Sequence, residues 1–215
     1  MIRLDILSDP ICPWCLIGKT HLDRARREAG DPFTVAWHPF QLNPDMPRDG
    51  MDRRSYLEAK FGGRRKAAEV YARIDDAARE AGLEIEWGAI ERTPNTLDAH
   101  RLIHWAGLEG RQDAVVDALF RTYFAEGGDI GDRSVLAGLA EGAGLDRALI
   151  ARLLETDADA EDIRQRDRHA RAKGVTGVPT FVVAEHHVVP GAQPVALWRE
   201  VIEELRGAPE GIRPS

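Results

Sequence analysis

The chain has 215 residues, 43% of them hydrophobic, so it can bury the core of one large domain without disulfide staples. Its formal net charge is −7 at pH 7 with acidic and basic residues well mixed, which argues against a nucleic-acid-binding surface. No apolar run approaches the roughly 20 residues of a membrane span, and Met1-Ile2-Arg3 leads directly into a strand pattern, so we expect a cytoplasmic protein without a membrane partner.

The first predicted elements are a strand over 2–7 and a helix over about 13–29. Apolar residues mostly alternate along the strand, and Ser8-Asp9-Pro10 is typical of the turn that follows. Pro13 suits the first turn of a helix, and Gly30 suits its end. The boundary between turn and helix therefore falls near residue 12.

The two cysteines of the chain, Cys12 and Cys15, lie at this boundary on either side of Pro13 and Trp14. A helix N-terminus favours a thiolate, so Cys12 is the candidate nucleophile. Cys15 lies one turn further along, and we expect it to be the more buried thiol and to act as the resolving one. Such a pair predicts disulfide exchange, in which a mixed disulfide forms on the first thiol and is released by the second.

The cysteine pair has two other interpretations. A zinc site normally needs four ligands, and the histidines of this chain are distant in sequence and lack metal-like spacing, so we expect no metal. A buried pair without reactivity is the other alternative, since free cysteine is among the most buried residue types. The turn and helix start around the pair favour redox chemistry.

After a second strand over 33–40, stopped by Pro39, the pattern changes from strand to helix for about a hundred residues. Residues 41–52 contain prolines and a glycine and are typical of a linker. Helical periodicity or capping then predicts helices around 67–81, 95–106, 116–124, 135–143 and 149–154. The charged segment 157–173 has acidic residues before basic ones, which suits a solvated helix.

The strand pattern returns near the C-terminus. Residues 180–184 and 188–189 are typical of a hairpin, with a short turn between them. The last helix is expected over about 194–206, ending at Gly207, with a frayed tail over 208–215.

This order of elements, with a CxxC pair opening the first helix and Gly177-Val178-Pro179-Thr180 opening the hairpin, resembles the DsbA-like branch of the thioredoxin superfamily. Segments 9–15, 95–101 and 177–181 are similar to its FrnE-like subgroup of dithiol-disulfide isomerases. The resemblance implies an α/β thioredoxin-like fold with a central mixed sheet, and a protein disulfide oxidoreductase or isomerase activity. It divides the chain into a discontinuous domain over 1–45 and 157–207, an all-helical insertion over 53–156 and a flexible tail over 208–215.

The resemblance further implies a cis bond between Val178 and Pro179, placing a strand edge beside Cys12. The Val178 backbone would then pair with an extended substrate segment. A trans proline that merely starts an edge strand is the alternative. The implied partner is a disulfide-containing protein or a small thiol. No tightly bound cofactor is expected, and glutathione is a candidate co-substrate. The expected assembly is a monomer or a homodimer. The Pro13-Trp14 pair differs from those of strongly oxidising or reducing relatives and leaves the direction of electron flow open.

The chain departs from the superfamily pattern in its acidic residues. Many thioredoxin-like proteins carry a buried acid six residues before the first cysteine, where this chain has Ile6. Because side chains alternate along a strand, Asp5 points to the opposite face from Leu4 and Ile6. Asp9 is best explained as a residue of the turn that follows. Lys19 could add positive charge near the thiols, although a helix lysine is more often solvated.

Two rival functions remain open. Related 2-hydroxychromene-2-carboxylate isomerases and kappa-class glutathione transferases typically have serine where this chain has Cys12, yet they share residues that could line a small-molecule cavity: Asn95, Thr96, His100 and Arg101. Asn95 is thus a candidate substrate-binding residue, and a helix N-cap is its alternative role. For His100 with His104 the alternative is two neighbours on one helix face. The other rival is an adaptor that binds unfolded chains at an apolar rim and carries incidental thiols.

Overall fold

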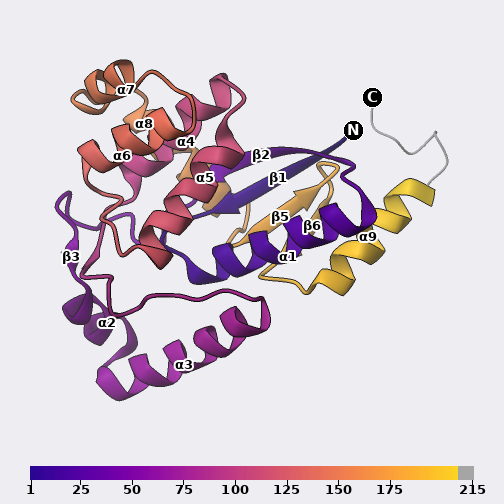
Figure 1. Cartoon of the computed structure of the whole chain (residues 1–215), viewed down its shortest axis with the longest axis horizontal. Helices are drawn as coiled ribbons and strands as arrows, with labels where there is room; N and C mark the ends of the chain where they lie inside the picture. Colours follow the sequence, from indigo (N-terminus) through magenta and orange to yellow (C-terminus); the bar gives the residue numbers. More distant parts are fainter. Residues whose placement is uncertain (208–215) are drawn as a thin grey trace.

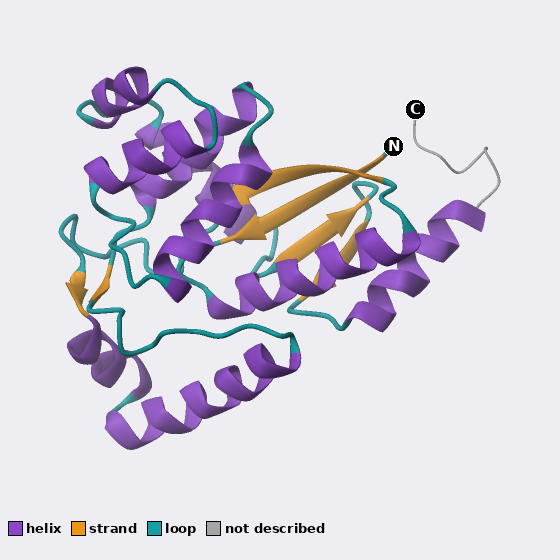
Figure 2. Cartoon of the chain, viewed as in Figure 1, coloured by secondary structure: helices purple, strands orange, loops and turns teal. Residues whose placement is uncertain are grey.

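The computed structural model describes residues 1–207, and its centre is a four-stranded mixed sheet (Figures 1 and 2). The strand order is β2 (Phe33–Pro39), β1 (Ile2–Ser8), β5 (Thr180–Val183) and β6 (His187–Pro190). β1 runs parallel to β2 and antiparallel to β5, and β5 forms a hairpin with β6. The sheet thus joins the two ends of the chain, as the resemblance implied.

One face of the sheet is covered by α1 (Pro13–Ala29) and α9 (Val195–Gly207), which lie side by side (Figure 1). Because successive residues of a strand face opposite sides, Leu4 and Ile6 point into this layer. Trp198 of α9 packs edge-on against Phe181 of β5, with ring centroids 4.8 Å apart. This layer holds the first turn of α1 against the sheet.

The other face of the sheet is covered by α8 (Ala160–Ala172). Leu7 and Val182 point to this side and pack near Ala170. The Asp167 carboxylate accepts a hydrogen bond of 2.8 Å from the backbone N–H of Gln41 and also pairs with Arg171. The charged segment predicted to be a solvated helix is therefore anchored through one fully buried carboxylate.

The segment between β2 and α8 contains most of the helices. They are α2 (Arg53–Phe61), α3 (Arg64–Glu80), α4 (Leu97–Leu108), α5 (Gln112–Phe120), α6 (Arg133–Gly142) and α7 (Arg147–Leu154). A short antiparallel pair, β3 (Met51–Asp52) and β4 (Arg92–Thr93), is added to them. The helix predicted around 116–124 ends at Phe120 and continues as a π-helical turn, η1 (Arg121–Ala125). One continuous apolar core joins this segment to the inner face of the sheet.

The outer edge of the sheet at β2 is covered by a side chain of α5. The Gln112 amide oxygen accepts a 2.9 Å hydrogen bond from the Trp37 backbone N–H, and its amide nitrogen donates to the Trp37 carbonyl at 3.3 Å. The Trp37 indole N–H donates to Asp113 at 2.6 Å. The start of α5 is thereby fixed against the middle of β2.

Within residues 1–207, no helix is both long and apolar enough to cross a membrane. The tail predicted over 208–215 lies outside the described residues.

Candidate active site

The two cysteines lie on the first turn of α1, as predicted. Cys12 is the N-cap residue, and its backbone N–H donates to the Asp9 carbonyl at 2.9 Å. The Cys15 backbone N–H donates in turn to the Cys12 carbonyl at 3.0 Å. Both residues are free cysteines and both are buried, with exposed fractions of 3% for Cys12 and 1% for Cys15. The expected contrast in burial between them is therefore small.

The two sulfur atoms differ more in their partners than in their exposure. Burial, followed by a hydrogen bond to the Cys12 sulfur, raises the pKa of the Cys15 thiol well above its ordinary value. The Ser8 hydroxyl and the Asp9 backbone N–H also reach the Cys15 sulfur and oppose this rise. Cys15 therefore keeps its proton at neutral pH and can donate it toward Cys12.

The loop before β5 lies directly against Cys12. The Val178–Pro179 peptide bond is cis, as the resemblance implied, so the alternative of a trans proline is wrong. The Val178 carbonyl oxygen lies 3.6 Å from the Cys12 sulfur. Pro179 is buried, whereas Val178 is partly exposed. The structure thus brings Cys12, Cys15 and Val178 together from opposite ends of the chain.

Gly18 is a site residue that the sequence analysis missed. It lies on α1 one turn after Cys15, and its Cα faces the ring of Pro179. The available signal was its spacing, since residues i and i+3 of a helix share a face. A small residue at this position allows the loop to approach the helix closely.

The rim of the site includes Trp14, whose side chain is 38% exposed although it lies between two buried cysteines. Ile6 is buried beneath the site, so the position that carries an acid in many thioredoxin-like proteins is apolar here. Lys19 is neither solvated nor directed at the thiols. Its ammonium group is buried and pairs with Asp23 at 2.5 Å and Asp117 at 2.6 Å, because α1 packs there against α5.

Asp9 has the turn role that the sequence predicted, since its carboxylate accepts the Ile11 backbone N–H at 3.3 Å. The sequence did not predict its burial. The residue is fully buried, and the same carboxylate accepts the Leu42 backbone N–H at 2.7 Å. It therefore lies inside the protein directly behind the cysteine turn.

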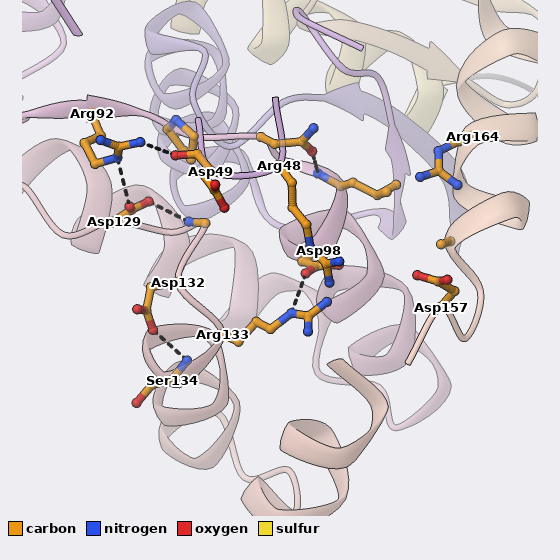
Figure 3. A pocket seen from close by; sticks show the side chains of 15 residues that line it. Arg48, Asp49, Arg92, Asp98, Asp129, Asp132, Arg133, Ser134, Asp157 and Arg164 are labelled. Atoms are coloured by element: carbon orange, nitrogen blue, oxygen red, sulfur yellow. Dashed lines mark hydrogen bonds and ion pairs between the residues drawn. The ribbon is translucent and has the colours of Figure 1, made fainter. Parts of the chain in front are cut away.

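Asn95 lies in the wall of a different cavity, of about 720 Å³, whose lining includes neither cysteine and neither Val178 nor Pro179. Its amide oxygen accepts the Leu97 backbone N–H at 2.9 Å, and its amide nitrogen donates to the Met46 carbonyl at 2.6 Å. Figure 3 shows that this cavity is lined by paired charges, such as Arg133 with Asp98 at 3.0 Å. The contacts of Asn95 are those of a helix-start residue.

Arg101 and His104 of α4 also have partners within the protein. Arg101 donates to the backbone carbonyls of three residues: Leu153, Thr156 and Ala158. The Arg166 guanidinium lies 3.2 Å from the Nδ1 atom of His104 and 3.3 Å from the Nδ1 atom of His38. His100 is buried and faces Asp9 instead. The two histidines therefore have different surroundings.

Comparison with known proteins agrees with this fold. The model of the DSBA-like thioredoxin domain family matches residues 3–203. A crystal structure of a probable DsbA oxidoreductase from Streptomyces coelicolor is 31% identical and superposes with a TM-score of 0.86, covering 100% of this chain and 94% of that one. YwbO of Bacillus subtilis, described as uncharacterised, is 29% identical over 94% of this chain and 96% of its own length. The cytosolic disulfide reductase DsbM of Pseudomonas aeruginosa, solved also with GSH, shares the fold at 23% identity and a TM-score of 0.67, with 96% and 100% of the two chains covered.

Proposed function

The chain belongs to the DSBA-like thioredoxin domain family, and we propose that it is a thiol–disulfide oxidoreductase in which Cys12 attacks and Cys15 resolves. The observation that carries this proposal is the asymmetry of the two sulfur atoms. The Cys12 sulfur lies at the helix N-cap beside the Val178 carbonyl, whereas the Cys15 sulfur holds its proton. A protonated neighbour that donates to the Cys12 sulfur favours the nucleophilic form of that residue.

The reaction then has two balanced steps. The Cys12 thiolate attacks a substrate disulfide, so that a Cys12–substrate disulfide forms and the other substrate sulfur leaves as a thiolate. The Cys15 sulfur next attacks the Cys12 sulfur and loses its proton, and the second substrate sulfur leaves with the electron pair. The substrate disulfide is reduced to two thiols, and the cysteine pair is oxidised to a disulfide. The same steps in reverse oxidise a dithiol.

We propose that substrates are bound as extended segments along the loop at Val178. The partly exposed Val178 lies beside the Cys12 sulfur, and the exposed Trp14 follows Cys12 by two residues in the chain. Backbone pairing at such a loop selects for an extended chain rather than for particular side chains. Both proteins containing disulfides and small disulfides such as oxidised glutathione therefore fit the proposal.

The test is equilibration of the purified protein across glutathione redox buffers, followed by acid quenching and intact-mass measurement. We expect the wild-type protein to convert reversibly between a dithiol and an internal disulfide, without a lasting adduct. Cys15→Ala should instead accumulate one glutathione on Cys12. Cys12→Ser should form neither product.

A wild-type protein whose thiols stay reduced at every buffer ratio, although they react once the chain is unfolded, would contradict the proposal. So would disulfide-exchange turnover retained by Cys12→Ser. That second result would favour a non-thiol isomerase, in which residue 12 acts as serine does in the isomerase branch.

A further inference from the structure

A cavity of about 750 Å³ lies between α2, α3 and the segment that leads from α3 into β4. The residues that line it include neither cysteine and neither of the two residues at the cis bond. Three alanines of α3 line it, together with Leu57, Ile90 and the rings of Tyr71 and Trp87. A cavity of this size, with apolar and aromatic walls, is typical of a pocket for a small molecule.

The wall of this cavity contains a buried cation, Arg53, which is the first residue of α2 and is only 8% exposed. Its guanidinium lies over the rings of Tyr71 and Trp87, 5.2 Å from each centroid. It donates to the Tyr71 hydroxyl at 3.0 Å and to the Tyr123 hydroxyl at 3.2 Å. These contacts use two of the five N–H donors of a guanidinium and hold the group in one orientation.

The positive charge of Arg53 has no counterion among residues 1–207, because its guanidinium forms no ion pair with a carboxylate there. The two hydroxyls that accept its hydrogen bonds are neutral. Burial raises the pKa of both Tyr71 and Tyr123, and the Arg53 charge only partly opposes the rise. The guanidinium of the equally buried Arg101, in contrast, pairs with Asp98 at 2.6 Å. A buried charge without a partner is costly, so its position beside a cavity calls for an explanation.

We propose that this cavity binds a small monocarboxylate with a flat apolar body, such as an aromatic acid, and that Arg53 pairs with its carboxylate. A planar guanidinium presents N–H donors in a fork that matches two carboxylate oxygens. Tyr71 and Trp87 hold this fork in place, and the alanines of α3 leave room for the body of the ligand. The ligand thus supplies the counterion that the chain does not. This site goes beyond the thiol chemistry proposed above and does not depend on it.

Three acidic residues that also line the cavity restrict the charge of the ligand: Asp52, Asp75 and Glu91. Asp52 caps the start of α2, and Asp75 pairs with Arg79, so each has another partner. Glu91 is exposed to water. Their negative charges oppose the entry of a phosphate or a dicarboxylate, because like charges repel where solvent is partly excluded. A single carboxylate on an apolar body meets Arg53 with the least repulsion.

The test is an NMR titration of the ¹⁵N-labelled protein with 2-naphthoate, followed through the indole N–H signals of the five tryptophans. Loss of a signal in Trp87→Phe or in Trp14→Phe identifies the two that matter. We expect the Trp87 signal to shift and saturate with a Kd of about 1 mM or below, as the size of the probe allows. The signal of Trp14, which lies between the cysteines in the chain, should stay in place. The neutral analogue 2-naphthamide should bind at least about tenfold more weakly, because it cannot form the charged pair.

Arg53→Met removes the charge but keeps an unbranched side chain at this position. We expect it to weaken naphthoate binding at least about tenfold. Arg54→Met is the matched control, since Arg54 lines the same cavity but is exposed, and it should change the affinity less than about threefold. The dispersion of the remaining indole signals shows whether each variant is folded.

Ala68→Phe gives a second test that keeps Arg53 and decides alone if Arg53→Met does not fold. The new ring should fill the cavity and abolish the naphthoate shift, whereas Arg73→Phe, on α3 but outside the cavity, should bind as wild type does. Naphthoate binding that survives Ala68→Phe would contradict the location of the site.

A wild-type Trp87 signal that does not move up to about 10 mM naphthoate, or equal affinity for naphthoate and naphthamide, would overturn the inference. Unchanged affinity in a folded Arg53→Met would do the same. None of these readouts involves a thiol, so such results would leave the proposed function of Cys12 intact. Thiols that stay inert in redox buffers while the Trp87 signal still shifts would instead contradict only the proposed function.

Discussion

Gly18 and Pro179 are in such close contact that a Cβ atom added at Gly18 would lie 3.0 Å from the Pro179 Cγ atom. The same Cβ would lie 3.3 Å from the Ala192 Cα atom and 3.4 Å from the Phe181 ring. A contact with backbone and with a fixed proline ring cannot be relieved by moving a flexible side chain. The absence of a side chain at Gly18 therefore sets how closely the proline loop approaches the cysteine helix.

Gly18→Ala should separate the loop from the helix. We expect a loss of about 1–3 kcal/mol in the free energy of unfolding, because the extra methyl overpacks a close contact. The rate of disulfide exchange at Cys12 should also fall, since Val178 would move away. Gly138→Ala on α6 is the control, because an added Cβ there meets nothing within 4 Å, and it should gain up to about 1 kcal/mol. Urea unfolding measures the stability of both variants relative to wild type. Equal stabilities of the two variants would contradict the predicted overpacking at Gly18.

Asp9 should make stability fall as pH rises. Its pKa is about 7 in the folded chain against 3.8 for the free side chain, so the folded state binds more protons between these values and loses stability as the carboxyl ionises. His100 has the opposite sign, because its pKa falls from 6.5 to about 4 on folding. The difference in unfolding free energy between Asp9→Asn and wild type should therefore shift in favour of the variant from pH 4 to pH 7, by up to about 1.4 kcal/mol per pH unit. Urea titrations at several pH values measure it, and a difference independent of pH would refute the assignment.

Arg101 should be a stability residue rather than a ligand-binding one. Its buried guanidinium donates to the Ala158 and Leu153 carbonyls, each at 2.7 Å, and pairs with Asp98 at 2.6 Å. Arg101→Met should cost about 3–5 kcal/mol, because these buried acceptors lose their donor. Arg133→Met is the control, since Arg133 pairs with the same Asp98 but its side chain is 32% exposed, and it should cost less than about 1 kcal/mol. Similar midpoints in urea for the two variants would show that Arg101 does not hold the helices.

Lys19 should have no measurable effect on the thiols. Two carboxylates neutralise its ammonium group, and both belong to side chains that keep access to solvent. Lys19→Met fills much of the same space, and the two carboxylates that lose their partner remain accessible to water. We expect the rate at which Cys12 releases a coloured thiolate from DTNB, an aryl disulfide, to stay within about twofold of wild type. A tenfold decrease would mean that the Lys19 charge acts on the cysteine turn.

Local patterns in the sequence predicted the elements that carry the site. Alternating apolar residues, Pro13 and Gly30 place β1 and α1 almost to the residue, because each signal depends on neighbouring positions. The π-helical turn after Phe120 was not predicted, since the helical spacing of apolar residues continues through it. The resemblance to known families, rather than any local signal, indicated the cis bond before Pro179.

The interior surroundings of the thiols were not predictable in the same way. Asp9 follows a strand and precedes a proline, which is typical of an exposed turn, and its burial depends on Leu42 and Thr96 from distant parts of the chain. Lys19 likewise becomes buried only because α5 supplies Asp117. Contacts between segments far apart in sequence decide whether a charged residue is solvated, and no local pattern contains them.

The pairing of Gln112 with Trp37 bears on how the protein behaves at high concentration. An edge strand with free backbone groups is a template on which another chain can add a strand and start aggregation. Here a side-chain amide takes both the N–H and the carbonyl of Trp37, as a peptide group of an incoming strand would. Gln112 therefore occupies the position of a neighbouring strand and ends the sheet in that direction, and its loss would expose a site for self-association at the edge of β2.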